Sequence, residues 1–192
     1  MPPGKHTLQT IDTILLGLLS RQRMHGYDLF KELARLEGIG MIWRIKQSLV
    51  YAILDKLERE GLLEGQRVQG ETRPDRKEYQ LTPAGKEVFL QWACHPVQHG
   101  REMRQDFLAR LYFARFISHK TALDLLEGQR SACKHWLEDF DVAYSKMNND
   151  QTFEKLVIQF RIQQTDAMLK WLDTCQNQLM QEIDYEQTNS GN

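Results

Sequence analysis

The chain has 192 residues, of which 41% are hydrophobic and 27% are charged, and its formal net charge is −1. This composition is too apolar for a disordered protein and is sufficient for one or two domains with a hydrophobic core. No apolar run approaches 18 residues and no apolar segment follows Met1, so we expect neither a membrane-spanning helix nor a signal peptide. The three cysteines are odd in number and far apart, which predicts free thiols and a cytoplasmic protein.

The two parts of the chain differ in charge. Residues 1–90 hold 14 Lys and Arg against 12 Asp and Glu, a net charge of +2, whereas the remainder holds 11 against 14, a net charge of −3. Many DNA-binding domains are nearly neutral overall and keep their positive charge local. The charge pattern therefore leaves a nucleic-acid partner open for the N-terminal part.

Helical periodicity begins close to the N-terminus. Apolar residues recur at a spacing of 3.6 over residues 8–20, with Thr7 as a plausible N-cap. A second helix is predicted from Tyr27 to Leu36, where glycines follow, and then a short extended piece over Met41–Ile45. A third helix is predicted over Gln47–Glu60. Its end is marked by Gly61, and its buried stripe consists of Val50, Ile53, Leu54 and Leu57.

A small β element follows the third helix. Residues 62–68 and 77–81 predict two strands, and the eight residues between them are rich in turn formers. Thr82 and Pro83 then suit the N-cap and first position of a fourth helix, which runs to about Ala93. Three helices followed by a two-stranded hairpin is the order of a winged helix-turn-helix, in which the third helix enters the major groove. We therefore predict a mainly α fold with a small two-stranded β wing.

The face of the third helix opposite its apolar stripe is small and polar near its start. Gln47 can bond adenine bidentately, Ala52 can touch a thymine methyl, and Tyr51 can reach a phosphate or base. Arg44 and Lys46 precede the helix, where a phosphate would lie near its N-terminus. The wing carries four cations, of which Arg67 is one. The predicted DNA-binding residues are Arg44, Lys46, Gln47, Ser48, Tyr51, Ala52, Arg73, Arg76 and Lys77.

Acidic residues lie among these cations, and any surface helix has a polar face. Asp55, Glu58 and Glu60 belong to the third helix, and Glu71 and Asp75 to the wing. The pattern alone therefore leaves open a winged helix that works only through contacts with other proteins.

Three segments together resemble the PadR family of transcriptional regulators. They are "HGYDLFKEL", "QSLVYAILDKLEREGLLEG" and "DRKEYQLTPAGKEVFLQW", in order over residues 8–93. The family pattern often has Pro or Arg where this chain has Ala52, and a polar residue where it has Leu49. The resemblance implies a cytoplasmic, sequence-specific regulator, more often a repressor, that binds double-stranded DNA at an inverted-repeat operator. A MarR-like ligand sensor shares the Leu-Thr-x-x-Gly of the wing and is the further alternative.

A linker over His95–Gly100 separates a second domain. We predict a winged domain over residues 1–94, a helical domain over 101–184 and a disordered tail over 185–192. The helices of the second domain are expected near 101–117, 120–147 and 151–183. The first resembles the "R-x-x-F-L-x-x-L-x-F" opening of the PadR C-terminal domain, which implies dimerisation and a subfamily with phenolic-acid repressors and virulence-gene activators.

Apolar stripes on the two long helices need a covering surface. Packing within one chain is one solution and a homodimer is the other. The residues predicted to form the dimer are Leu126, Cys133, Phe140, Met147, Phe153, Phe160 and Trp171.

Other kinds of site find little support. Cys94 and His95 with His99, and Cys133 with His135, do not give four metal ligands at a useful spacing. The chain has no phosphate-binding loop, no dinucleotide turn and no fixed nucleophile, so we predict neither an enzyme nor a cofactor. The four tryptophans suit core packing. Alternatively, some of them could line a cavity between the winged domain and the helical arm. The family resemblance implies that the protein senses a small aromatic effector.

Overall fold

The structure, a computed structural model, describes residues 8–35, 45–68 and 76–190, except the side chains of residues 68, 76 and 186–190. It consists of two compact units that meet between Ala93 and Cys94, beside the predicted end of the first domain. No helix in the described ranges has both the length and the apolar character needed to cross a membrane.

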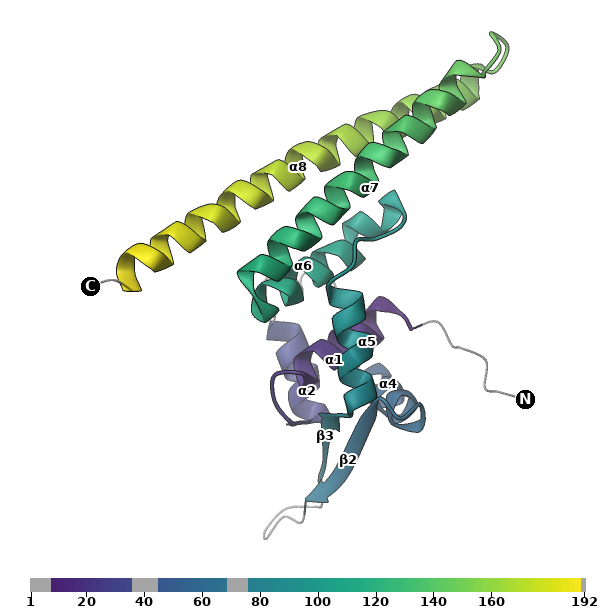
Figure 1. The fold of residues 1–192 in the computed structure, drawn as a ribbon. Helices are drawn as coiled ribbons and strands as arrows, with labels where there is room; N and C mark the ends of the chain where they lie inside the picture. Colours follow the sequence, from purple (N-terminus) through teal and green to yellow (C-terminus); the bar gives the residue numbers. More distant parts are fainter. Residues whose placement is uncertain (1–7, 36–44, 69–75, 191–192) are drawn as a thin grey trace. The chain divides into compact units, whose positions relative to one another are not determined.

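The N-terminal unit has the predicted winged-helix order (Figure 1). Thr7 and most of the extended piece predicted at 41–45 lie outside the described residues, and Gln9 is the N-cap of the first helix. The described elements are α1 (Thr10–Leu19), β1 (Met24–His25), α2 (Gly26–Arg35), α4 (Gln47–Arg59), β2 (Leu63–Val68), β3 (Arg76–Leu81) and α5 (Pro83–Ala93).

The sheet has three strands in the order β1-β3-β2, where the sequence predicted two. Met24 pairs with Tyr79 and His25 with Glu78, so β3 is the central strand. The periodicity missed β1 because two residues are too few to show the alternation that marks a strand.

Hydrogen bonds of Thr82 join the end of the sheet to the helix before it, α4, and to the helix after it, α5. Thr82 caps α5 by accepting a hydrogen bond from the Gly85 N–H (3.1 Å), and its hydroxyl donates to the carbonyl of Gly61 (2.7 Å). Gly61 has φ 72°, the left-handed conformation that ends α4. A Cβ at Gly85 would lie 2.0 Å from the carbonyl oxygen of Leu62. The Leu-Thr-x-x-Gly pattern of the wing therefore has a structural cause.

An ion pair holds α1 against α4. The Asp12 carboxylate is 2% exposed, accepts the backbone N–H of Gln9 and receives the Lys56 ammonium at 2.6 Å. Pairing with a cation and a backbone donor satisfies a carboxylate that burial would otherwise destabilise. The ion pair fixes the face of α4 that lies toward α1, and the opposite face of α4 stays exposed.

The C-terminal unit contains helices and connecting loops, and no strand among its described residues. It contains a 3-10 helix, η1 (Gly100–Arg104), followed by α6 (Asp106–Ile117), α7 (His119–Ser145) and α8 (Thr152–Ser190). The predicted helix over 101–117 is thus divided at Gln105, which has non-helical φ −135° and ψ −58°. Figure 1 shows α7 and α8 lying side by side as an antiparallel pair joined by a short turn.

Helix α8 continues to Ser190, so the segment predicted as a disordered tail from 185 is helical as far as that residue. Extending an existing helix costs little compared with starting one, and the extension needs no apolar stripe of its own. The sequence prediction ended the helix where its apolar pattern ended.

The core of this unit corrects part of the predicted dimer surface. Leu126 is 1% exposed and Cys133 is 0% exposed, and both pack against other apolar residues of the same chain. Neither has surface to offer to a second copy. The alternative of packing within one chain is correct for these two positions, because α6 and α8 cover this part of α7.

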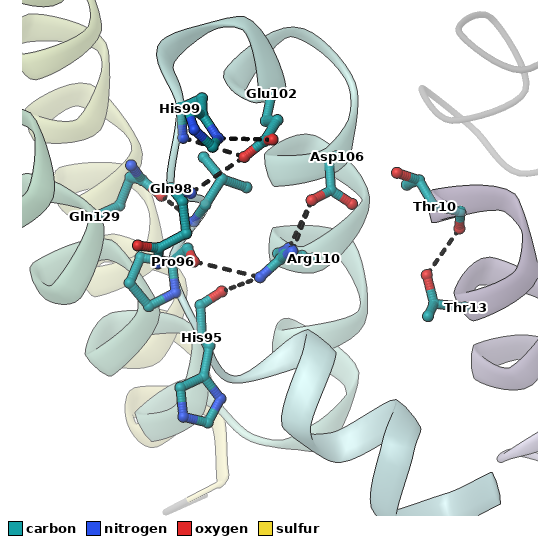
Figure 2. Close-up of polar contacts among 11 residues, drawn as sticks. Thr10, Thr13, His95, Pro96, Gln98, His99, Glu102, Asp106, Arg110 and Gln129 are labelled. Carbon is teal, nitrogen blue, oxygen red and sulfur yellow. Dashed lines mark hydrogen bonds and ion pairs between the residues drawn. The ribbon is translucent and has the colours of Figure 1, made fainter. Parts of the chain in front are cut away.

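The segment between Cys94 and η1 is tied to the helical unit by polar contacts (Figure 2). The buried Gln129 accepts the backbone N–H of Val97 at 2.8 Å. Arg110 donates to the carbonyl of His95 at 2.7 Å and pairs with Asp106. These bonds satisfy backbone groups that have no helix or strand to join.

Candidate nucleic-acid interface

Helix α4 has one buried face and one exposed face. Val50, Ile53, Leu54 and Leu57 are at most 5% exposed and pack into the unit. Lys46, Gln47, Ser48, Tyr51 and Ala52 are exposed. The buried stripe follows from apolar residues at helical spacing, so the face left in solvent is the one predicted to read DNA.

The start of α4 is electrostatically open to an anion. Lys46 is its N-cap and has extended backbone, and the first turn contains no acidic residue. The positive end of the helix dipole and the N–H groups of the first turn favour a phosphate at this position. Lys46 adds an exposed positive charge beside it.

The ring of Tyr51 lies against the start of α2. A Cβ at Gly26 would lie 2.6 Å from Cε1 of Tyr51, so the ring could not keep this position beside a larger residue. The side chain of Tyr51 still has 38% of its surface exposed. Tyr51 therefore packs with part of its ring and keeps the rest available for a base or a phosphate.

Two cations stand opposite each other in the wing. Arg67 on β2 is paired in register with Lys77 on β3, and like charges in that position repel. The Glu58 carboxylate of α4 bonds the Lys77 ammonium and also accepts the Gly65 N–H at 3.2 Å. The hydrogen bond with Glu58 raises the pKa of Lys77, although burial opposes this shift.

Gly65 is part of the same arrangement. A Cβ there would lie 2.2 Å from Cε of Lys77, so the missing side chain leaves room for the lysine to reach α4. Glu58, Gly65 and Lys77 together form a contact between the wing and α4, which we call the wing clamp. In this structure Lys77 serves the wing clamp, whereas Arg67 is exposed and has no acidic partner among the described residues.

The predicted DNA-binding residues fall into three groups. Five of them form the exposed start of α4, and Lys77 is directed to Glu58. Arg44 and Arg73 lie outside the described residues, as does the side chain of Arg76. From the sequence, Glu58 is only a negative charge that opposes DNA binding. The contact between Lys77 and α4 could have been predicted from the alternation of side chains in β3. Lys77 lies on the same face of the strand as the buried Tyr79, and that face points toward α4.

The chain is similar to known transcriptional regulators over both units. Residues 15–91 match the PadR-like family of transcriptional regulators, and residues 103–180 match the C-terminal domain of the virulence activator alpha family. The negative transcriptional regulator PadR of Bacillus subtilis is 28% identical over 143 residues, which cover 73% of this chain and 76% of that protein.

Solved structures of similar proteins include two complexes. Bacillus subtilis PadR bound to operator DNA is 24% identical, covers 90% of this chain and 99% of its own, and gives a TM-score of 0.46. The same protein bound to p-coumaric acid is 26% identical, covers 89% and 99%, and gives a TM-score of 0.38.

The two family matches fall on the two units of the structure, and the winged unit has the helix and strand order of a DNA-binding winged helix. The MarR-like alternative is set aside by the family match, and proteins of the matched family are regulators and not enzymes. The chain belongs to the PadR-like family of transcriptional regulators and joins a winged-helix unit to a helical C-terminal domain.

Proposed function

We propose that the chain is a homodimeric repressor that binds an inverted-repeat operator and is released by a small aromatic effector. The observation that carries the proposal is the exposed start of α4, where Gln47, Ser48 and Ala52 stand clear of the buried stripe. Side chains of this size and polarity suit close approach to base edges in the major groove.

The charges near this face support binding to the phosphate backbone. Lys46 lies at the N-terminus of α4, and Arg67 lies on the wing, which flanks the groove in this fold. Glu58 neutralises Lys77, so we assign the electrostatic contribution of the described wing residues mainly to Arg67.

The surface of α8 supports dimerisation. Phe153, Leu156, Val157 and Phe160 follow a spacing of three and four residues and are 40–74% exposed. An apolar stripe of this kind on a helix is typical of an interface with another chain. A dimer doubles the sequence that is read, because two recognition helices reach half-sites roughly 34 Å apart.

The proposals of repression and of an aromatic effector rest on what the names of similar proteins say. The Bacillus subtilis relative is named a negative regulator, which supports repression. The same protein has been described in complex with p-coumaric acid, an aromatic acid, and we carry the chemical class over as a proposal for this chain.

One feature favours a regulator that works through protein contacts alone. Leu49 is 44% exposed on the face that would read DNA, where an apolar side chain gives no hydrogen bond to a base. Salt dependence separates the two functions, because contacts with phosphates release counterions and apolar protein contacts do not.

The test is a salt titration of binding to duplex DNA from the intergenic region beside the gene, which we expect to contain an inverted repeat. We expect the logarithm of the association constant to fall linearly with the logarithm of salt concentration, and a scrambled duplex to bind at least about 1,000-fold more weakly. Absence of binding at low ionic strength would contradict the proposal. Equal affinity for the scrambled duplex would contradict sequence reading.

A further inference from the structure

Leu49 is an exposed leucine on a helix whose other leucines are buried. Leu54 and Leu57 of α4 are each 0% exposed, whereas 44% of the Leu49 surface is in solvent. Among the described residues of the winged unit, Leu49 is the one exposed large apolar side chain that is purely aliphatic, since Tyr27 and Tyr51 each carry a hydroxyl. The hydrophobic core therefore does not explain this leucine.

Helical geometry places Leu49 beside Ala52 on one flank of the exposed face of α4. Residues three apart are neighbours on a helix surface, and both of these are exposed. Gln47 and Tyr51, four residues apart, lie together on the opposite flank, and Ser48 lies between the two flanks. The exposed start of α4 thus has one flank that can form hydrogen bonds and one flank that is apolar.

The charged residues nearest to the apolar flank leave it neutral. Lys56 lies two helical turns beyond Leu49, and its ammonium pairs with the buried Asp12 carboxylate at 2.6 Å on the side of α1. Asp55 lies two turns beyond Ser48, on the middle of the exposed face. The first turn of α4 contains no acidic residue. The surface around Leu49 is therefore suited to an apolar group.

The chemistry of the major groove decides which group that is. Base pairs present hydrogen-bond donors and acceptors there, and the C5 methyl of thymine is the apolar feature. An apolar side chain against the edge of the bases therefore favours thymine at the position it touches. Burying one methyl group in such a contact is worth about fourfold in affinity.

We propose that Leu49 is a specificity-determining residue that packs on a thymine methyl in each half-site, next to the position that Ala52 reaches. The preference for thymine at that position comes from an apolar contact and needs no hydrogen bond. Leu49 acts in this way only when α4 lies in the major groove, so its role rests on the proposed function. A protein partner is the other occupant that an exposed leucine suits, and the experiment separates the two.

A scan of the operator with deoxyuridine tests the contact, because this base keeps the hydrogen-bonding groups of thymine and lacks only the methyl. The duplex is the intergenic fragment that the protein binds in the salt titration, and each thymine is replaced in turn at matched positions of both half-sites. Fluorescence anisotropy measures the affinity. We expect at least one such pair of replacements to weaken binding of the wild-type protein roughly 15-fold, about fourfold for each half-site.

Variants of Leu49 assign the lost affinity to this side chain. Leu49→Ala and Leu49→Asn should bring the ratio of thymine to deoxyuridine affinity at that pair close to one, because both remove the apolar contact. Leu49→Met stays apolar with a similar volume and should keep the ratio several-fold above one. Ser48→Ala is the matched control, because it truncates the neighbouring exposed residue without touching the apolar flank, and it should leave the ratio unchanged. Circular dichroism verifies that each variant is folded.

Two results would overturn the role of Leu49 and leave the proposed function intact. In the first, the wild-type protein binds the operator specifically, but no pair of thymines responds to loss of the methyl. In the second, Leu49→Ala keeps every response of the wild-type protein, which would show that the leucine faces a protein partner or solvent and no base. If the wild-type protein bound no duplex specifically, the proposed function would fail, and the role of Leu49 with it.

Discussion

The two units of the chain differ in how they cover their apolar residues. Among the described residues of the winged unit, the large apolar side chains with an exposed surface are Tyr27, Leu49 and Tyr51, all on α2 and α4. The described part of the helical unit exposes many more, and most of them follow α8 over much of its length. The winged unit thus completes its own core, whereas the helical unit leaves an exposed apolar face of the kind that marks a contact with another molecule.

Charged substitutions on that face should have the largest effect. We expect Phe153→Glu with Phe160→Glu to raise the dimer dissociation constant at least about 100-fold, because each would bury an unpaired charge in an apolar interface. Sedimentation velocity over a range of protein concentrations measures the dimer dissociation constant. Asn148→Glu with Asn149→Glu, in the exposed turn between α7 and α8, adds the same charge outside the stripe and should leave the dimer unchanged. A wild-type monomer at micromolar concentration would contradict the interface.

The self-contained core of the winged unit can be tested at Gly85. The Cβ of Gly85→Ala would clash with the Leu62 carbonyl at 2.0 Å, so we expect a loss of about 2–3 kcal/mol in the free energy of unfolding of this unit.

Hydrogen exchange of the amides in β2 and β3 under increasing urea reports the unfolding free energy of the winged unit. The control is Gly128→Ala in α7, whose Cβ would make ordinary 3.6 Å contacts with Pro96. It should be neutral or stabilise the helical unit by up to about 1 kcal/mol. If Gly85→Ala and Gly128→Ala lowered the free energy of unfolding equally, the close approach at Gly85 would not be the cause of the loss.

The exposed residues of the winged unit should matter for DNA rather than for folding. Tyr51→Ala would remove both the hydroxyl and the packing on Gly26, so Tyr51→Phe is the sharper variant. We expect it to weaken operator binding about tenfold and to leave the unfolding free energy within about 0.5 kcal/mol. Fluorescence anisotropy with labelled operator measures the binding. Unchanged affinity would mean that the hydroxyl of Tyr51 contacts neither base nor phosphate.

The smallest expected effect is the difference between the two wing cations, Arg67 and Lys77. Arg67→Ala should lower the slope of log K against log salt by about 1, because an exposed arginine releases roughly one counterion. Lys77→Ala should lower it by clearly less, since Glu58 already neutralises this lysine. The same salt titration measures both variants. Equal changes in slope would show that Lys77 leaves Glu58 when DNA binds.

Much of the fold followed from local patterns. The stripe Val50, Ile53, Leu54 and Leu57 placed α4 within one residue of its observed end, and Thr82 with Pro83 marked the start of α5, because caps and periodicity act over a few residues. β1 was missed because two residues show no alternation, and the break at Gln105 was missed because no Gly or Pro marks it in the sequence.

The candidate site was predictable only in part. The exposed start of α4 followed from helical geometry, whereas the partner of Lys77 depends on how the hairpin lies against α4, which no local pattern encodes. The same holds for Leu126 and Cys133. Their spacing predicted an apolar stripe correctly, but spacing does not tell whether the covering helix comes from the same chain.

The place of β3 in the middle of the sheet has a mechanical consequence. A change in the tilt of the hairpin would strain the main-chain pairing of β3 with Met24 and His25, and His25 leads directly into α2. The first turn of α2 in turn touches the ring of Tyr51 at Gly26. A strain applied at the hairpin would therefore be transmitted through two residues of backbone to the exposed start of α4, so the element proposed to contact the DNA backbone and the element proposed to read bases are expected to shift together.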